Sequence, residues 1–100
     1  MSVTPETRIK QQIIQLLKNL NIWNFPIMQG LGCYPGIPDR FACYKGRVFA
    51  IEVKSPKGKQ SAAQERFQKA WEFHSKQPYI LARSVDDVIV GLGLKDLFDG

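Results

Sequence analysis

Two short runs of alternating residues, 38–44 and 47–54, constrain the fold of this chain more than any other feature of its sequence. Both runs are rich in β-branched and aromatic residues, and only Lys45 and Gly46 separate them. A two-residue connection with glycine in the second position suits a tight hairpin turn, because such turns require a positive φ. The two runs therefore predict an antiparallel β-hairpin.

The length of the turn fixes which residues of the hairpin oppose each other. If Lys45 and Gly46 form the turn, Tyr44 pairs with Arg47, and counting back places Asp39 opposite Glu52. Directly opposed residues share a face of the sheet with their Cβ atoms about 4.5–5.5 Å apart, and like charges there are destabilising. Alternation places Lys54 on the face of Glu52. The opposite face of this strand is apolar and carries Phe49, Ile51 and Val53.

Two opposed carboxylates predict a metal site. A divalent cation would relieve their repulsion, and ligands that are all oxygen suit Mg²⁺ or Mn²⁺ better than zinc. The ammonium of Lys54 could orient a water molecule or neutralise charge on a phosphodiester, so these residues predict metal-dependent hydrolysis. The alternative is a surface ion pair of Lys54 with Glu52, with Asp39 serving only as a turn residue after Pro38.

Helix signals lie on both sides of the hairpin. Thr4 is a good N-cap, Pro5 suits the first helical position, and apolar residues at helical spacing predict a helix over residues 5–20. Ser61 followed by Gln64 forms a capping box and predicts a second long helix over residues 62–75.

The remaining segments complete a single domain of order αβββαβα. Residues 23–29 predict a strand interrupted by a proline, residues 30–36 a flexible loop, and residues 78–83 a buried strand. Ser84 begins a final helix, which carries Val85, Val88, Ile89 and Leu92. The length of 100 residues suits one domain.

Neither a membrane protein nor a zinc protein is indicated. No apolar run approaches the roughly 18 residues needed to cross a bilayer, and residues 1–6 do not form a signal peptide, so we expect a cytoplasmic protein. Cys33, Cys43 and the single His74 cannot furnish a standard four-ligand zinc site.

An excess of basic residues points to a polyanionic partner. Lys and Arg number 14 against 9 Asp and Glu, which gives a formal net charge of +5. Lys57 and Lys59 lie in a segment without acids that Pro56 and Gly58 make a loop. We expect these lysines to contact phosphates; the alternative is a solvated charge run.

The hairpin residues also resemble a known signature. Gly36-Ile37-Pro38-Asp39 followed by Ile51-Glu52-Val53-Lys54 resembles the PD-(D/E)XK nuclease motif, and specifically the VRR-NUC domain. The resemblance extends from Glu6 in the first helix to the strand at Tyr79. It implies a restriction-endonuclease-like αβββαβ core within the α/β class, a mixed central sheet flanked by helices, and an additional C-terminal helix, with residues 1–100 as one nuclease domain.

The resemblance also implies a set of site residues. Asp39, Glu52 and the main-chain carbonyl of Val53 would bind the metal, with Glu6 as a further candidate ligand. The catalytic candidates are Glu6, Asp39, Glu52, Lys54 and Gln64. Glu6 lies on the core-facing stripe of its helix, although a glutamate in a first turn is commonly only a partner of the helix dipole. Gln64 can equally be the capping partner of Ser61. The candidate DNA contacts are Tyr34, Gly36, Lys57 and Lys59.

The expected activity is that of a Mg²⁺- or Mn²⁺-dependent DNA endonuclease that recognises structure. A chain this small has little area for reading base sequence, so shape and backbone are the expected targets, and the resemblance suggests branched DNA such as Holliday junctions. The alternatives are a sequence-specific restriction-type nuclease and a catalytically silent nucleic-acid-binding module.

Two symmetric cuts in a four-way junction imply a homodimer. Two apolar clusters are candidate interfaces: Trp23, Phe25, Ile27, Met28, Leu31 and Tyr34 form the first, and Leu94, Leu97 and Phe98 form the second. The alternative is that both clusters belong to the core of the monomer.

Overall fold

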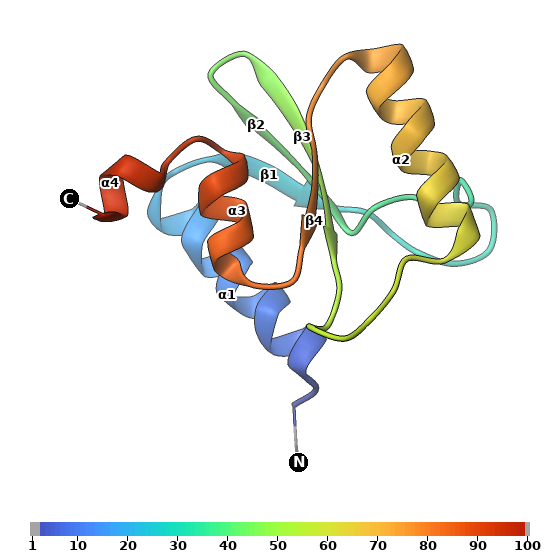
Figure 1. The fold of residues 1–100 in the computed structure, drawn as a ribbon, viewed down its shortest axis with the longest axis horizontal. Helices are drawn as coiled ribbons and strands as arrows, with labels where there is room; N and C mark the ends of the chain where they lie inside the picture. The colour runs from blue at the N-terminus through green and yellow to red at the C-terminus, as the bar shows by residue number, and fades with distance from the viewer. Residues whose placement is uncertain (1–2, 100) are drawn as a thin grey trace.

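A four-stranded mixed sheet with strand order β1-β2-β3-β4 lies at the centre of the molecule, flanked by helices (Figure 1). The computed structural model describes residues 3–99, with side chains to residue 97. The strands are β1 (Trp23–Pro26), β2 (Arg40–Tyr44), β3 (Arg47–Val53) and β4 (Tyr79–Ala82). The helices are α1 (Pro5–Asn19), α2 (Ala62–Ser75), α3 (Val85–Gly91) and α4 (Lys95–Asp99).

The β2–β3 hairpin has the register that the sequence predicts. Its ladder runs from the pair Tyr44↔Arg47 to the pair Arg40↔Ile51. Both turn residues have positive φ, 51° at Lys45 and 77° at Gly46, as a type I′ turn requires. β1 adds to this hairpin antiparallel, and β4 adds on the other side of β3 in parallel.

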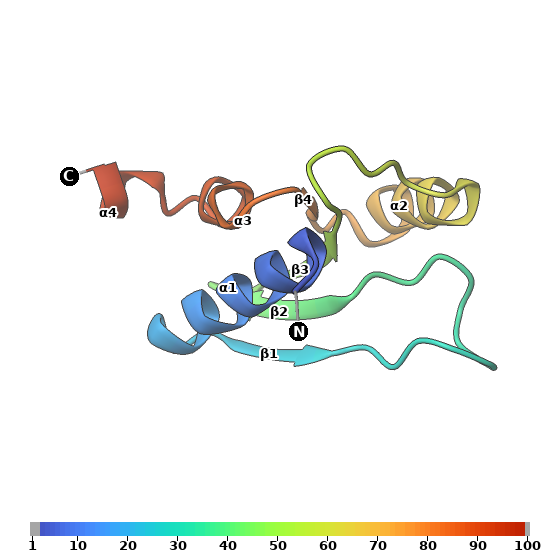
Figure 2. The same ribbon diagram turned by 90° about the horizontal axis from the view of Figure 1, so that it is seen from below.

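The two faces of the sheet are covered by different helices. Figures 1 and 2 show α1 and α3 on one side of the strands and α2 on the other. Ile13 and Leu17 of α1 are buried in one core with Ile51 of β3 and Val88 of α3. The α2 face is aromatic instead, and its rings are those of Phe25, Phe41, Phe67, Trp71 and Tyr79. Both faces of β3 are therefore buried.

Several element boundaries differ from the sequence prediction. β1 ends at Pro26, because proline has no N–H to continue the ladder, although Ile27 still donates to the carbonyl of Asp39 at 2.9 Å. The expected helix after Ser84 is α3, which ends at Gly91 with Leu92 as its C-cap. Gly93, with a φ of 77°, then precedes a separate helix, α4, that the sequence did not predict. The predicted helix over residues 62–75 and its capping box are confirmed. Within residues 3–99, no helix is long and apolar enough to span a bilayer.

The two apolar clusters that are candidate interfaces differ in how exposed their side chains are. Trp23, Met28 and Leu31 are 68%, 87% and 109% exposed, so much of the first cluster lies on the surface. In the second cluster, Leu94 is buried in the core of the monomer, and Leu97 is exposed. The side chain of Phe98 lies outside the described part of the chain.

Gly36 allows the loop between β1 and β2 to approach the start of α2. A Cβ atom at this position would lie 2.2 Å from the carbonyl oxygen of Ala63 and 2.7 Å from the nitrogen of Gln64. Its φ of +77° also favours glycine. The need for glycine at this position is thus explained by backbone packing.

We expect Gly36→Ala to destabilise the protein more than Gly32→Ala. Both glycines have positive φ, so alanine incurs the same conformational penalty of about 1–2 kcal/mol at either position. At Gly32 nothing lies within 4 Å of the added Cβ, whereas at Gly36 the backbone of α2 must move, which adds about 1–3 kcal/mol. Urea unfolding of the two variants measures the difference, and equal losses would contradict the close approach.

Candidate active site

The carboxylate of Glu52, near the end of β3, is the most deeply buried charge in the described residues. The residue is 0% exposed. Its Oε1 accepts hydrogen bonds from the hydroxyl of Tyr79 and, at 3.1 Å, from the side-chain amide of Gln60. Its Oε2 has no hydrogen-bond partner among the described residues, and Lys54 Nζ lies 3.9 Å from it. One carboxylate oxygen is thus fully engaged, and the other faces only an ammonium group.

Strand alternation and α2 together explain this burial. Glu52 and Lys54 lie on the same face of β3, as predicted, and this face is turned toward the helix that follows the basic loop. The ring of Phe67 in α2 lies 6.4 Å from that of Tyr79, between their centroids. An ionised carboxylate in such surroundings is costly unless a positive charge compensates it. The polar face that the sequence predicts for this strand is therefore covered by α2 at Glu52.

Tyr79 is a fixed hydrogen-bond donor to Glu52. Burial raises the pKa of its hydroxyl far above the ordinary value, and the hydrogen bond to Glu52 and the charge of Glu52 raise it further. The charge of Asp39 raises this pKa as well, to a smaller extent. The phenol of Tyr79 remains protonated and holds Oε1 of Glu52 in place.

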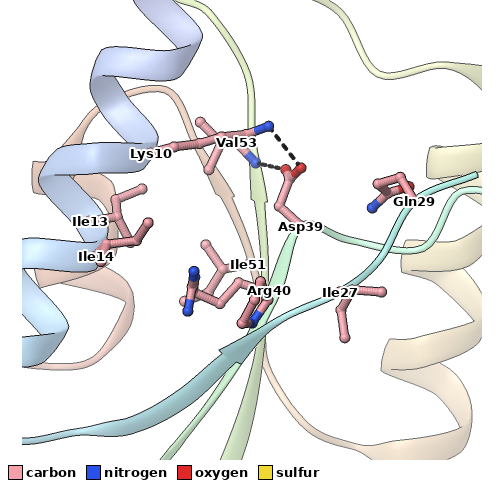
Figure 3. Close-up of a pocket in the computed structure, with 10 residues that line it drawn as sticks. Lys10, Ile13, Ile14, Ile27, Gln29, Asp39, Arg40, Ile51 and Val53 are labelled. Carbon is pink, nitrogen blue, oxygen red and sulfur yellow. Dashed lines mark hydrogen bonds and ion pairs between the residues drawn. The ribbon is translucent and has the colours of Figure 1, made fainter.

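Asp39 does not oppose Glu52 across the hairpin as the register predicted. The ladder stops at Arg40↔Ile51, and the N–H of Asp39 donates to the carbonyl of Ile51 at 3.0 Å. The side chain takes the place of a main-chain acceptor instead: Oδ2 accepts the N–H of Val53 at 2.7 Å (Figure 3). The carboxylate of Asp39 thus lies at the end of the sheet, against the peptide bond that joins Glu52 to Val53.

Lys10 of α1 also forms an ion pair with the carboxylate of Asp39 (Figure 3). Its Nζ lies 3.3 Å from Asp39 Oδ1 and 3.5 Å from Glu6 Oε2. Burial lowers the pKa of Lys10, but the charges and hydrogen bonds of Asp39 and Glu6 outweigh this effect, so the net pKa is raised. The structure therefore connects Glu6 to Asp39 through Lys10.

A small cavity of about 200 Å³ opens beside Asp39, between α1 and the sheet. Its walls are mainly apolar and include Ile13, Ile27 and Ile51 (Figure 3). Lys10 and Arg40 contribute the positive charges of the lining. The carboxylate of Asp39 thus borders an accessible space, whereas that of Glu52 is enclosed.

The glutamine that reaches Glu52 is Gln60, which the sequence reasoning missed. Its amide also donates to Gln68 of α2 at 2.9 Å. Gln64, the residue expected at the site, accepts the N–H of Ser61 at 2.8 Å and is thus the capping-box partner. Gln60 lies in a loop without hydrophobic periodicity, so no sequence signal marked it.

The basic loop that follows β3 is held by Arg83. The guanidinium of Arg83 donates to the carbonyl of Ser55 at 3.0 Å and to that of Gly58. Lys57 and Lys59 of this loop are exposed to solvent. Of the other candidate DNA contacts, Tyr34 is 62% exposed, and Gly36 packs on α2 as described above.

The donor groups fit an oxygen-ligated divalent cation. Glu52 Oε2 is a buried acceptor without a hydrogen bond, and Asp39 supplies a second carboxylate at the adjacent peptide. Within residues 3–99, no group of three or more histidine, cysteine, aspartate or glutamate side chains could hold a metal. A site of two carboxylates suits Mg²⁺, which keeps several waters, better than a metal that needs a full protein cage.

No model of a known protein family matches this chain, and no curated protein matches it in sequence.

Replacing Tyr79 with phenylalanine tests the hydrogen bond to Glu52 through the pH dependence of stability. The pKa of Tyr79 in the folded protein is raised above the unfolded value of about 10, so its contribution is present below that pH and is lost as the pH rises above it. In EDTA, between roughly pH 9 and pH 11, we expect Tyr79→Phe to lose less free energy of unfolding than the wild type. The difference cannot exceed about 1.4 kcal/mol per pH unit, because a single proton is involved, and solvent screening of this partly exposed group makes the total effect smaller.

Urea unfolding at each pH measures this effect. Tyr34→Phe, which alters an exposed tyrosine, controls for the general effect of alkali on a tyrosine variant. Parallel losses in Tyr79→Phe and the wild type would show that the hydroxyl does not hold the carboxylate.

Proposed function

We propose that this protein is a Mg²⁺-dependent, structure-specific DNA endonuclease with a restriction-endonuclease-like core, similar to VRR-NUC domains. One observation carries the proposal: the buried Oε2 of Glu52 has no hydrogen-bond partner among the described residues and faces Lys54 at 3.9 Å. A structural carboxylate in such a place would be expected to have both oxygens hydrogen-bonded. An oxygen that lacks a partner suits a ligand that binds there.

The ion would be held by Asp39, Glu52 and the main-chain carbonyl of Val53. A divalent cation supplies Lewis-acid chemistry for phosphodiester hydrolysis when it is bound. Tyr79 and Gln60 fix the Oε1 atom of Glu52, which leaves Oε2 to point toward the ligand.

Lys54 acts on the phosphate. Its ammonium neutralises the negative charge that develops on the phosphoryl oxygens, which stabilises the transition state more than the ground state. Lys10 balances the charge of Asp39 at 3.3 Å and would release that carboxylate if a cation were held there. Glu6, the second partner of Lys10, would then receive that ammonium.

The proposed substrate is branched DNA, such as a four-way junction. The net charge of +5 and the exposed Lys57 and Lys59 favour contact with phosphates, and contacts of this kind carry no sequence information. A sequence-specific restriction-type nuclease would need a larger surface for base edges. A catalytically silent DNA-binding module does not require a buried carboxylate oxygen without a hydrogen bond, because burying such an oxygen destabilises the fold.

Replacing either carboxylate with its amide should abolish cleavage and leave DNA binding nearly intact. Asp39→Asn and Glu52→Gln preserve shape but remove the charge that would hold Mg²⁺. Incubation of a labelled four-way junction with Mg²⁺, Mn²⁺ or EDTA, beside a linear duplex and a flap, measures cleavage. Glu72→Gln, which alters an exposed carboxylate of α2, is the matched control and should cleave like the wild type.

Thermal unfolding gives a second reading that does not depend on activity. Mg²⁺ should stabilise the wild type and Glu72→Gln, because a ligand that binds only the folded state raises its stability, and it should not stabilise Glu52→Gln. Cleavage by both amide variants at the wild-type rate would overturn the site assignment.

We also propose that the active form is a homodimer, since one site per chain must make two cuts in a symmetric junction. The exposed Trp23 and Phe25 lie on β1, which is an edge strand of the sheet and can meet a second copy.

Light scattering at micromolar concentration should give about twice the monomer mass of 11.4 kDa. Trp23→Lys should return the protein to the monomer and lower the junction-cleaving activity. Full junction cleavage by a wild-type monomer would disprove the dimer.

A further inference from the structure

A hollow of about 510 Å³ separates α2 from the loop that connects β1 to β2. Tyr34 and Pro35 of the loop form one wall, and Ala63, Arg66, Phe67 and Ala70 of α2 form the other. Figure 2 shows this loop extending beneath α2, away from the helices of the opposite face. The two alanines leave room between the larger side chains, so the hollow can receive a flat ligand.

The loop wall is held in position by backbone packing. Gly36, two residues after Tyr34, packs against the first turn of α2 with no room for a side chain. The ring of Tyr34 meets the ring of Phe67 edge-on, with 5.7 Å between centroids and an interplanar angle of 76°. Tyr34 is nevertheless 62% exposed. The ring of Tyr34 is therefore held in position before a ligand arrives, and its exposed part is available for stacking on that ligand.

The charge of the hollow is positive. Arg66 is exposed on its rim, and the lining residues include no acid. None of the ion pairs within the described residues involves Arg66. The acids of α2, Glu65 and Glu72, line a different surface of the helix. A planar guanidinium beside exposed aromatic rings suits a phosphate and an attached base.

The hollow also lies next to the residues of the proposed active site. Phe67 contacts both Tyr34 and Tyr79, with centroid distances of 5.7 Å and 6.4 Å, and the hydroxyl of Tyr79 donates to Glu52. A single aromatic ring therefore separates the hollow from the residues that hold the carboxylate. A ligand in the hollow would lie close to a phosphodiester at Glu52.

We propose that this hollow binds an unpaired nucleobase of the DNA substrate, stacked on Tyr34, with Arg66 on a neighbouring phosphate. The inference rests on the proposed nuclease function and narrows its substrate class. Bases within a closed duplex are stacked on each other, so only a branch with unpaired nucleotides can fill the hollow. Branched DNA with a single-stranded arm is then preferred to a fully paired junction.

Binding in EDTA tests the proposal without cleavage. The probes are a labelled duplex with a single-stranded thymidine arm, the same DNA with abasic sites throughout the arm, and a blunt duplex. Stacking of one base predicts that the wild type binds the thymidine arm about 5- to 150-fold more tightly than the abasic arm. Tyr34→Ala should remove this difference, and Tyr34→Phe should keep it. Arg66→Ala should weaken binding to both arms.

Phe73→Ala is the matched control, because Phe73 is a 67% exposed aromatic residue of α2 outside the hollow. It should keep the wild-type preference for bases. Equal affinity of the wild type for the two arms, or an unchanged preference in Tyr34→Ala, would overturn the proposal. A loss of dimer mass in Tyr34→Ala with the base preference unchanged would assign the hollow to a second copy of the chain and would also overturn it.

The two proposals fail in different ways. A base preference that depends on Tyr34, in a protein that never cleaves DNA with any metal, would refute the nuclease and leave the base site standing. Metal-dependent cleavage without any base preference would refute the base site alone.

Discussion

The contact on which the rest of the site depends is the hydrogen bond from Tyr79 to the buried carboxylate of Glu52. It joins the central strand β3 to the edge strand β4 on the face that α2 covers. A carboxylate at this depth would otherwise be strongly destabilising. Tyr79 and Gln60 donate hydrogen bonds to Oε1 of Glu52, so its other oxygen, Oε2, is left to interact with the ammonium of Lys54. The aromatic packing of α2 thus has a consequence for charge: it excludes the water that would screen Glu52.

The carboxylates of Asp39 and Glu52 lie in two different environments. Asp39 is partly open, is balanced by Lys10 and borders a cavity, whereas Glu52 is enclosed. The side chain of Asp39 lies against the peptide bond between Glu52 and Val53, because it completes the hydrogen bonding of the sheet at Val53. The carboxylate of Asp39 is paired with a lysine at the edge of the cavity, whereas the carboxylate of Glu52 is held in one position by Tyr79 and Gln60. In the proposed metal site, Asp39 would therefore be the carboxylate that borders the cavity and Glu52 the enclosed one.

The hairpin and the long helices could be predicted because local rules determine them. The Lys45-Gly46 turn fixed the register, and Ser61 with Gln64 fixed the start of α2. The position of Asp39 could not be read in this way, since its side chain replaced a main-chain acceptor one residue beyond the ladder. Gln60 and the burial of Glu52 were missed for a related reason. Both depend on how α2 folds back over the sheet, and no periodic pattern records that long-range packing.

The parallel pairing of β3 with β4 has a consequence for folding kinetics. The hairpin closes through two residues, but Glu52 and Tyr79 are separated by 27 positions along the chain, so their contact needs the whole crossover through α2. Non-local contacts of this kind form slowly, because the entropy of loop closure is lost before any contact compensates it. During folding, the hairpin can therefore exist with Glu52 still hydrated. The carboxylate acquires its buried character only when the crossover docks, so the site and the native topology are completed in the same step.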